Sequence, residues 1–472
     1  MPQQNQNVRP LGSTGLYCHP MGFGTYRVQD GIAKHEAALR AYLDRGGNLI
    51  DTSANYGDGL SEILIERVLK DFDRSKIILV TKGGYIQGQN MELAQQRQFP
   101  EIVRYTDGLW HCIHPEFLET QIDRSLQRLD QKYVDGYLLH NPEYYINHAA
   151  QIEPISDKVL DEFYRRIRAA FEYLESQVQS GRIRFYGISS NNFGYHERDR
   201  AGTSVVRSLE AAESVSRDHH FRIIQLPLNL YEAGGAVYPS HKGQTVFEFC
   251  KSNGIGVLIN RPLNAFYQNK LVRLADFVTP GSPAPGDQAL NELLLPLEEA
   301  EHEFSSKFGA EAFGEKHEGL AEYFKYIIND LPSRDYWEAM MDQYIIPPVT
   351  HWLKENHQKF LREPDWAPWQ NEFIRRINQA MDEIEKFLSF KDQPKSDAIR
   401  QKLYEAGYPQ SPESLSRMAL SVVAQLDGVS CVLNGMRTPA YVDDAMYATD
   451  MPRVSALEIL KEFFRNLNGV VA

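Results

Sequence analysis

Short apolar segments alternate along most of this chain with longer segments whose apolar residues recur at helical spacing. Such alternation is typical of βαβ units, in which helices join the parallel strands of one sheet. Strands are predicted over residues 21–24, 48–53, 76–82, 134–140, 184–189, 222–226, 256–260 and 429–435. Because this is the strand number of a (β/α)8 TIM barrel, we expect an α/β protein with that fold. A doubly wound open sheet is the alternative, since periodicity alone does not show closure.

A long segment between the seventh and eighth predicted strands interrupts the alternation. It is far longer than an ordinary βα connection. We therefore expect residues 1–265 and 411–472 to form the barrel, and residues 266–410 to form a large helical insertion of unknown role after strand seven. Apolar residues such as Phe373 and Ile377 recur there at helical spacing, which predicts helices.

The composition of the insertion predicts a packed structure. Four of the chain's five tryptophans lie in it, namely Trp337, Trp352, Trp366 and Trp369. We expect a helical subdomain packed on the barrel mouth, with residues 278–288 as a linker rich in proline and glycine. A separate helical domain on a tether is the alternative.

Charge and cysteine content narrow the possible functions. The chain has 50 Lys and Arg against 63 Asp and Glu, a formal net charge of −13, which argues against nonspecific binding to nucleic acid or anionic membranes. No apolar run reaches the roughly 18 residues of a membrane span, and no signal peptide is predicted. The four cysteines are widely spaced without a C-x-x-C pair, which favours a reducing compartment. We expect a cytoplasmic protein without a bound metal.

Polar residues end the predicted strands, where the chemistry of a parallel barrel is located. In strand order they are Asp51, Lys82, His140, Ser189, Gln225, Asn260 with Arg261, and Gly435, and Tyr56 follows Asp51 by five residues. Each has a structural explanation when taken alone: an aspartate can cap a turn, and a histidine can be half-buried.

Together, four of these residues predict a proton-transfer site. Asp51 and Lys82 can form an ion pair, and an ammonium beside a phenol is expected to lower the pKa of Tyr56. Tyr56 would then be a usable acid, and His140 could give the same oxygen a second hydrogen bond. A glycosidase needs two facing carboxylates, and Asp51 is the only one at these strand ends.

The residues around these positions identify a family. The segments GSTGLYCHPMGFGT, NLIDTSANYG, IILVTK, DGYLLHNPE, FYGISSNNF, IIQLPLN and VLNGMRTPAYVDDA resemble the aldo-keto reductases in order and spacing. The resemblance implies the (β/α)8 barrel and a nicotinamide cofactor, NADP(H). It also implies that Tyr56 is the general acid, that Lys82 and Asp51 tune it, and that His140 orients the carbonyl of the substrate.

The resemblance also implies a set of cofactor-binding residues. Gly24 and Thr25 would lie under the nicotinamide, Ser189, Asn191 and Gln225 would hold its carboxamide, and Gly435, Met436, Arg437, Thr438 and Asp444 would hold the adenosine part. Physical chemistry supports part of this set. A helix that begins at Thr438 and Pro439 has free N–H groups that attract an anion, and Arg437 can pair with a 2′-phosphate.

Two features depart from the family pattern. Asn260 and Arg261 stand where an aromatic residue usually stacks on the nicotinamide, and Arg261 could reach the pyrophosphate of the cofactor or an acidic substrate. The other departure is the insertion. We expect a reductase of small carbonyl compounds or a dehydrogenase of sugar-type alcohols, and the alternative is an NADPH-binding regulatory protein with little turnover. Nothing in the sequence identifies a protein partner for the insertion.

Overall fold

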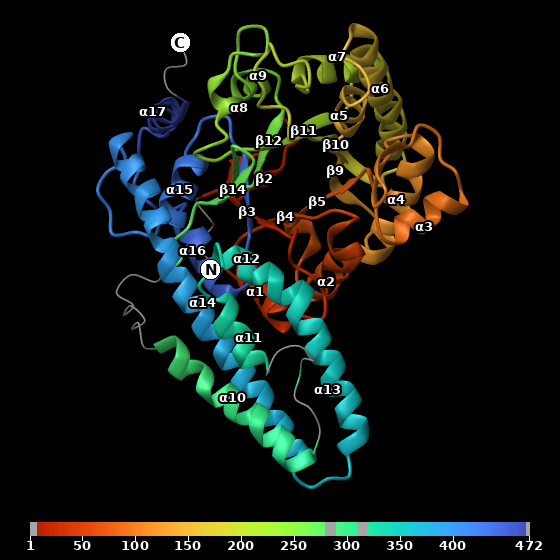
Figure 1. Ribbon diagram of the computed structural model, residues 1–472. Helices are drawn as coiled ribbons and strands as arrows, with labels where there is room; N and C mark the ends of the chain where they lie inside the picture. Colours follow the sequence, from red (N-terminus) through yellow and green to blue (C-terminus); the bar gives the residue numbers. More distant parts are fainter. Residues whose placement is uncertain (1–6, 279–288, 310–312, 314–318, 469–472) are drawn as a thin grey trace. The chain divides into compact units, whose positions relative to one another are not determined.

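A computed structural model describes residues 7–278, 289–309, 313 and 319–468 (Figure 1). The chain divides into two compact units, a barrel unit of residues 1–274 and 402–472 and a helical unit of residues 275–401. Apart from residue 278, the predicted linker 278–288 lies outside the described residues.

Eight parallel strands form a closed barrel, so the predicted (β/α)8 fold is confirmed and the open sheet is excluded. The strands are β3 (Met21–Gly24), β4 (Leu49–Asp51), β5 (Ile78–Gly83), β9 (Val134–His140), β10 (Ile183–Ser189), β11 (Phe221–Pro227), β12 (Gly256–Asn260) and β15 (Cys431–Gly435). The barrel closes where β15 pairs with β3, with Val432 opposite Met21 and Gly435 opposite Gly24.

Helices surround the strands in the order that the periodicity predicts (Figure 1). They are α1 (Ala33–Asp44), α2 (Leu60–Leu69), α4 (Pro115–Leu129), α6 (Asp157–Gln179), α7 (Val205–Val215), α9 (Val246–Ser252), α15 (Leu415–Ala424), α16 (Pro439–Tyr447) and α17 (Ala456–Asn468). Serine side chains cap the N-termini of three of these helices. The hydroxyl accepts a backbone N–H of the first turn in each case, from Ser156 in α6, Ser204 in α7 and Ser414 in α15.

The barrel interior is filled by apolar side chains from its strands. Val80, Leu138, Ile223 and Leu258 belong to one buried cluster, which Leu11 extends at the N-terminal end. This Leu11 lies between the short strands β1 (Arg9–Pro10) and β2 (Tyr17–Cys18), which pair as a hairpin. The interior is therefore a packed core, and polar chemistry is confined to the strand ends.

Smaller elements lie in the loops that connect the strands and helices of the barrel. A three-stranded antiparallel sheet follows β5, formed by β6 (Tyr85–Ile86), β7 (Val103–Thr106) and β8 (Leu109–His111), and it also carries α3 (Gln89–Gln96). The other short helices are η1 (Tyr56–Gly59), η2 (Arg74–Lys76), α5 (Tyr144–Ala150) and α8 (Gly234–Val237).

The helical unit lies in sequence between β12 and β15, which confirms the predicted insertion after strand seven. Its helices are α10 (Ala289–Phe308), α11 (Leu320–Ile327), α12 (Arg334–Met340), η3 (Met341–Ile345), α13 (Ile346–Phe360) and α14 (Trp366–Glu405), the last of which continues beyond residue 401. The unit begins later than residue 266, because residues 264–273 form the hairpin β13 (Asn264–Tyr267) and β14 (Lys270–Arg273), which belongs to the barrel unit.

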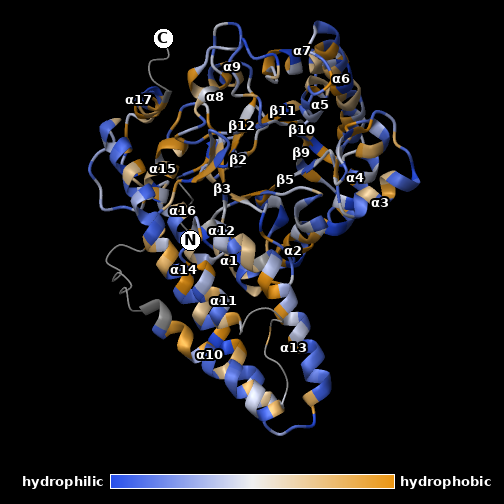
Figure 2. Cartoon of the chain, viewed as in Figure 1, coloured by the Kyte–Doolittle hydropathy of each residue, from blue (hydrophilic) through white to orange (hydrophobic). Residues whose placement is uncertain are grey.

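Aromatic packing holds the helical unit together. Apolar residues alternate with polar ones along its helices (Figure 2), and the buried ones form a core of their own that includes Trp337, Trp366 and Trp369. Trp369 stacks on Phe373 with ring centroids 4.9 Å apart, and its Nε1 donates to the carbonyl of Ala300 at 2.9 Å. Among the described helices, none combines the length and the apolar character that crossing a bilayer would require.

Replacing Trp369 by alanine should destabilise the helical unit by about 3 to 5 kcal/mol, because it leaves a cavity in the core and removes the hydrogen bond to the Ala300 carbonyl. Urea unfolding followed by tryptophan fluorescence measures this, since four of the five tryptophans are in the insertion. Tyr326→Ala is the control, because Tyr326 is 75% exposed and its loss should change stability little. Equal midpoints for both variants would contradict this packing.

Candidate active site

The polar residues that end the barrel strands gather at one end, because all eight strands run parallel. Their register aligns them: Ser189 of β10 lies opposite His140 of β9 on one side and Gln225 of β11 on the other. Asp51 of β4 lies opposite Gly24 of β3.

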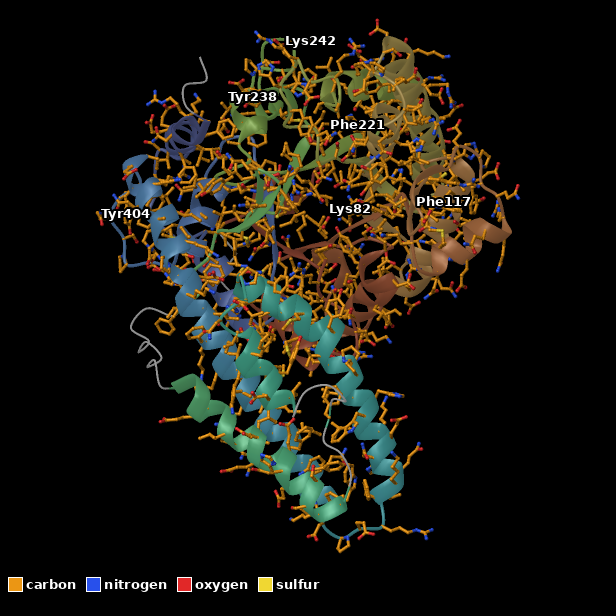
Figure 3. The ribbon with its side chains drawn as sticks, in the orientation of Figure 1. Lys82, Phe117, Phe221, Tyr238, Lys242 and Tyr404 are labelled. Carbon is orange, nitrogen blue, oxygen red and sulfur yellow. The ribbon has the colours of Figure 1, made fainter. Side chains whose placement is uncertain are left out.

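A buried ion pair forms the centre of the site. Lys82, within the ring of strands (Figure 3), is fully buried, and its Nζ donates to Asp51 Oδ2 at 2.7 Å and to the carbonyl of Thr52 at 2.8 Å. Gln225 Nε2 donates to the other carboxylate oxygen at 2.7 Å. Burial raises the pKa of Asp51 and lowers that of Lys82, while their mutual attraction and the Gln225 bond oppose these shifts.

Tyr56 approaches the same ammonium. Its hydroxyl lies 3.4 Å from Lys82 Nζ, and Nζ lies 5.0 Å from the centroid of its ring. Burial raises the pKa of Tyr56 well above 10, and the negative charge of Asp51 adds to this shift. The expected lowering of this pKa is therefore wrong for the protein alone, because burial outweighs the nearby cation. Tyr56 is a neutral phenol at neutral pH and can donate a proton.

His140 lies beside Tyr56, with ring centroids 5.8 Å apart. Burial, with the positive charge of Lys82 as a smaller cause, lowers the pKa of His140 well below 6.5, so the ring is neutral. Its Nδ1 lies 2.9 Å from Ser53 Oγ, and Tyr85 packs edge-on against the ring at 4.6 Å between centroids. His111 Nε2 donates to the His140 carbonyl at 2.7 Å. The ring is thus held from several sides.

The residues expected at the nicotinamide carboxamide are linked to this centre. Ser189 Oγ donates to Gln225 Oε1 at 3.0 Å, and Asn260 Nδ2 donates to the same oxygen at 3.2 Å. Since Gln225 also bonds Asp51, one chain of hydrogen bonds joins three strand ends to the ion pair. Thr25 bonds the backbone carbonyl of Asp51 through both its N–H and its hydroxyl, at 3.0 Å each.

Glu143 is a buried carboxyl that the sequence reasoning missed. Its Oε1 accepts the backbone N–H of Asn191 at 2.8 Å, whereas its Oε2 is buried without a hydrogen-bond partner among the described residues. Burial raises the pKa of Glu143 to about 7. It lies three residues after His140 in the segment HNPE, and an acidic residue so close to a strand-end histidine was the available signal.

The residues expected at the adenosine phosphate surround the start of α16. Thr438 caps this helix by accepting the N–H of Tyr441 at 3.3 Å, and Pro439 occupies its first turn. Gly435 ends β15, Met436 is buried, and Arg437 directly precedes the cap. The first turn of α16 therefore presents backbone N–H groups, and Arg437 lies one residue before its cap.

Two of the expected cofactor residues bond other side chains of the protein. Arg261 Nη2 donates to Glu232 Oε1 at 2.6 Å, and its guanidinium lies 4.9 Å from the centroid of Phe266. Asp444 accepts from Arg417 Nε at 2.7 Å and from the hydroxyls of Ser414 and Ser416. Either residue would have to exchange or share these bonds to meet a cofactor.

Within the described residues, no group of three or more His, Cys, Asp or Glu side chains is arranged to hold a metal ion. At the barrel end a lysine, a carboxylate, a phenol and an imidazole lie together.

Comparison with known proteins gives the family. A model of the aldo/keto reductase family matches residues 20–293, more than half of the chain. The chain therefore belongs to the aldo/keto reductase family.

Individual relatives are distant and aligned over part of their length. The NADH-specific methylglyoxal reductase of Escherichia coli strain K12 is 24% identical over 266 residues, which cover 54% of this chain and 66% of that protein. The L-galactose dehydrogenase of Arabidopsis thaliana is 31% identical over 189 residues, 39% of this chain and 48% of that protein. This chain thus spans less than two thirds of the length of these relatives.

Among solved structures, an aldo-keto reductase from Bacillus halodurans covers 97% of this chain and 96% of its own, at 16% identity and a TM-score of 0.49. A putative aldo-keto reductase from Pseudomonas aeruginosa covers 55% of this chain and 79% of its own, at 21% identity and a TM-score of 0.36.

Glu143→Gln should remove a pH-dependent loss of stability. The pKa of about 7 in the folded protein lies above the ordinary value of 4.5, so the unfolded chain releases the proton first as pH rises. Stability therefore falls between pH 4.5 and 7, and above that range the cost is on the order of 3 kcal/mol.

Free energies of unfolding from denaturant titrations at pH 5 and pH 8 measure this. Relative to wild type, the free energy of unfolding of Glu143→Gln should be higher at pH 8 than at pH 5. The control Glu197→Gln, at an exposed position, should have the free energy of unfolding of the wild type at both pH values. A constant difference across this range would show that Glu143 does not titrate there.

Proposed function

We propose that this protein transfers hydride between NADP(H) and a small carbonyl compound, or the corresponding sugar-type alcohol in reverse, with Tyr56 as general acid and base. The proposal rests chiefly on one observation: the Tyr56 hydroxyl lies 3.4 Å from the buried ammonium of Lys82, which Asp51 holds at 2.7 Å. Two relatives are named for methylglyoxal, a small carbonyl compound, and for L-galactose, a sugar, and both kinds of substrate are included in this proposal.

Groups at the strand ends fit a nicotinamide carboxamide, which both donates and accepts hydrogen bonds. Asn260 Oδ1 and Glu143 Oε2 are buried oxygens without a partner among the described residues. Asn260 ends β12 and Glu143 follows β9, the strands on either side of β10 with Ser189 and β11 with Gln225. Such orphaned acceptors suit an amide N–H. We propose that Ser189, Asn191 and Gln225 hold this end of NADP(H).

We propose that the loop after β15 holds the adenosine end of the cofactor. Residues 435–438 with the first turn of α16 would hold the adenosine phosphates, and Arg437 would pair with the 2′-phosphate. Gly24 and Thr25 would line the nicotinamide, and Arg261 and Asp444 would complete the set by exchanging their present partners. When bound, the cofactor supplies the hydride.

The residues of the site move the proton. Tyr56, protonated because of its raised pKa, donates to the carbonyl oxygen as negative charge develops there. The tyrosinate that forms is stabilised by the ammonium of Lys82, which Asp51 keeps in place. Neutral His140 gives the same oxygen a second hydrogen bond and fixes its position. In the reverse direction the tyrosinate accepts the proton of the alcohol.

The proposal assigns the reaction to the barrel residues 1–265 and 411–472 and sets it in the cytoplasm. All four cysteines are free and buried, which supports a reducing compartment. The insertion 266–410 is left without a proposed role in this reaction, and no protein partner is proposed for it.

Tyr56→Phe should lower turnover by about 100- to 10,000-fold while leaving cofactor binding intact, because it removes the proton donor and keeps the ring. Oxidation of NADPH by 4-nitrobenzaldehyde measures turnover, and quenching of NADPH fluorescence measures binding. Tyr26→Phe is the matched control: its ring lies 5.3 Å from that of Tyr56 but is 67% exposed. Unchanged turnover in Tyr56→Phe would overturn the mechanism.

Arg437→Ala tests the choice of cofactor, since the relative from Escherichia coli is named as NADH-specific. If Arg437 holds the 2′-phosphate, the variant should weaken NADPH binding by about tenfold or more, the value of a charged hydrogen bond, and leave NADH nearly unchanged. Equal losses for both nucleotides would remove Arg437 from this position.

A broad panel of aldehydes, ketones and sugars separates the enzyme from the regulatory alternative. Asn260 stands where the family usually stacks an aromatic ring, and this departure favours weak turnover. Tight NADPH binding without reduction of any carbonyl in the panel would support the regulatory protein.

A further inference from the structure

The helical unit carries a groove of its own between α13 and α14. The groove has a volume of about 630 Å³. Ligand sites typically have volumes of about 300 to 1,000 Å³. All of its described lining residues belong to η3, α13 and α14, so the groove lies within one compact unit. No carboxylate is among these described lining residues, although the chain has 63 Asp and Glu.

The two walls of the groove run antiparallel. Residues 361–365 join the end of α13 to the start of α14, and Trp366 at that start bonds His357 near that end. From Ile346 to His357 and from Gln370 to Met381, each wall is about 16 Å long at the helical rise of 1.5 Å per residue. The groove is therefore long enough for an extended ligand.

Apolar side chains line most of the groove away from residues 361–365. Val349 and Ile377 form part of its floor and belong to the buried core of the unit. Ile346 and Ile374 also line it, and they are 40% and 38% exposed. Contiguous exposed apolar side chains of this kind are typical of a binding surface. This part of the groove suits an aliphatic chain.

The end next to residues 361–365 is lined by hydrogen-bond donors. Trp366 Nε1 donates to His357 Nδ1 at 2.9 Å, and an indole N–H only donates. Nδ1 is therefore the acceptor and the N–H of His357 is on Nε2, which bonds none of the described residues. Lys354 lies three residues earlier, on the same face of α13. No described carboxylate pairs with Lys354, and the adjacent Glu355 lies 3.4 Å from His351 Nε2 instead.

We propose that this groove binds a long-chain fatty acid as its anion. The carboxylate lies at the ammonium of Lys354 and the Nε2–H of His357, and the aliphatic chain lies along Ile346 and Ile374. Donors at one end and apolar walls along the rest select an amphipathic ligand, and the cation without a carboxylate partner selects an acid over an amine. This site is independent of the proposed oxidoreductase function.

Isothermal titration calorimetry of the full-length protein with sodium laurate below its micelle concentration tests the head group. We expect saturable binding, and at least tenfold weaker binding of dodecyltrimethylammonium, which has the same tail and a positive head. Each CH₂ added to the fatty acid should tighten binding by up to about fourfold, the value of a buried methylene. Absence of saturable laurate binding, or equal affinity for the two head groups, would overturn the proposal.

Lys354→Glu should weaken laurate binding by about 10- to 100-fold, because it replaces a charged donor with a like charge. Lys359→Glu is the matched control: it makes the same charge change at an exposed position of α13 that does not line the groove. Equal losses in the two variants would remove the carboxylate from Lys354 and overturn the proposal.

Ile374→Glu tests the path of the aliphatic chain. A carboxylate on the apolar wall should weaken laurate binding by about tenfold or more, because the tail would desolvate it. Tyr326→Glu is its control, since Tyr326 is 75% exposed on α11 and does not line the groove. Far-UV circular dichroism checks that both variants fold. Laurate affinity equal to wild type in Ile374→Glu would overturn the proposal.

A second copy of this chain is the competing occupant of the groove. Sedimentation velocity of the wild type and of Ile374→Glu distinguishes the two. A monomer that binds laurate supports the fatty-acid site. A wild-type dimer that Ile374→Glu dissociates would assign the groove to a second copy and overturn the proposal.

Discussion

The buried ion pair of Lys82 and Asp51 is the interaction on which the rest of the site depends. An ammonium with no exposed surface is tolerated in a barrel only because a carboxylate lies 2.7 Å from it and a carbonyl lies 2.8 Å from it. Loss of one partner of such a pair typically costs about 3 to 5 kcal/mol, since the other charge is left buried alone. The same pair fixes Gln225 on one side and faces Tyr56 on the other.

Closure of the barrel brings other polar residues to the end that carries this ion pair. Strand β15 lies between β12 and β3, so the loop of Arg437 and Thr438 meets the same barrel end as the early strands. The helical unit is inserted between β12 and β15 without breaking their ladder, in which Leu258 lies opposite Cys431. This unit has a buried core of its own, which includes Trp337, Trp366 and Trp369.

Much of the fold and part of the site could be predicted from local patterns. The strands, the insertion after strand seven and the capped helix at Thr438 each follow from spacing or from a few adjacent residues. Other features could not be predicted, because they depend on contacts across the barrel. The carboxylate of Glu143 accepts the backbone N–H of Asn191, which follows a different strand. Arg261 donates to Glu232, which lies in the loop after the preceding strand.

The sequence by itself determined the alternation of strands and helices, the resemblance to the family, and which polar residues end the strands, because these depend on spacing and on adjacent residues. Closure of the strands into a barrel was shown only by the tertiary structure. Only the tertiary structure decided how those residues behave. The pKa of Tyr56 rises instead of falling, because burial is a property of the whole barrel end and outweighs one nearby cation. The bonding of His140 was likewise decided in three dimensions, since it depends on Ser53, a residue distant from it in sequence.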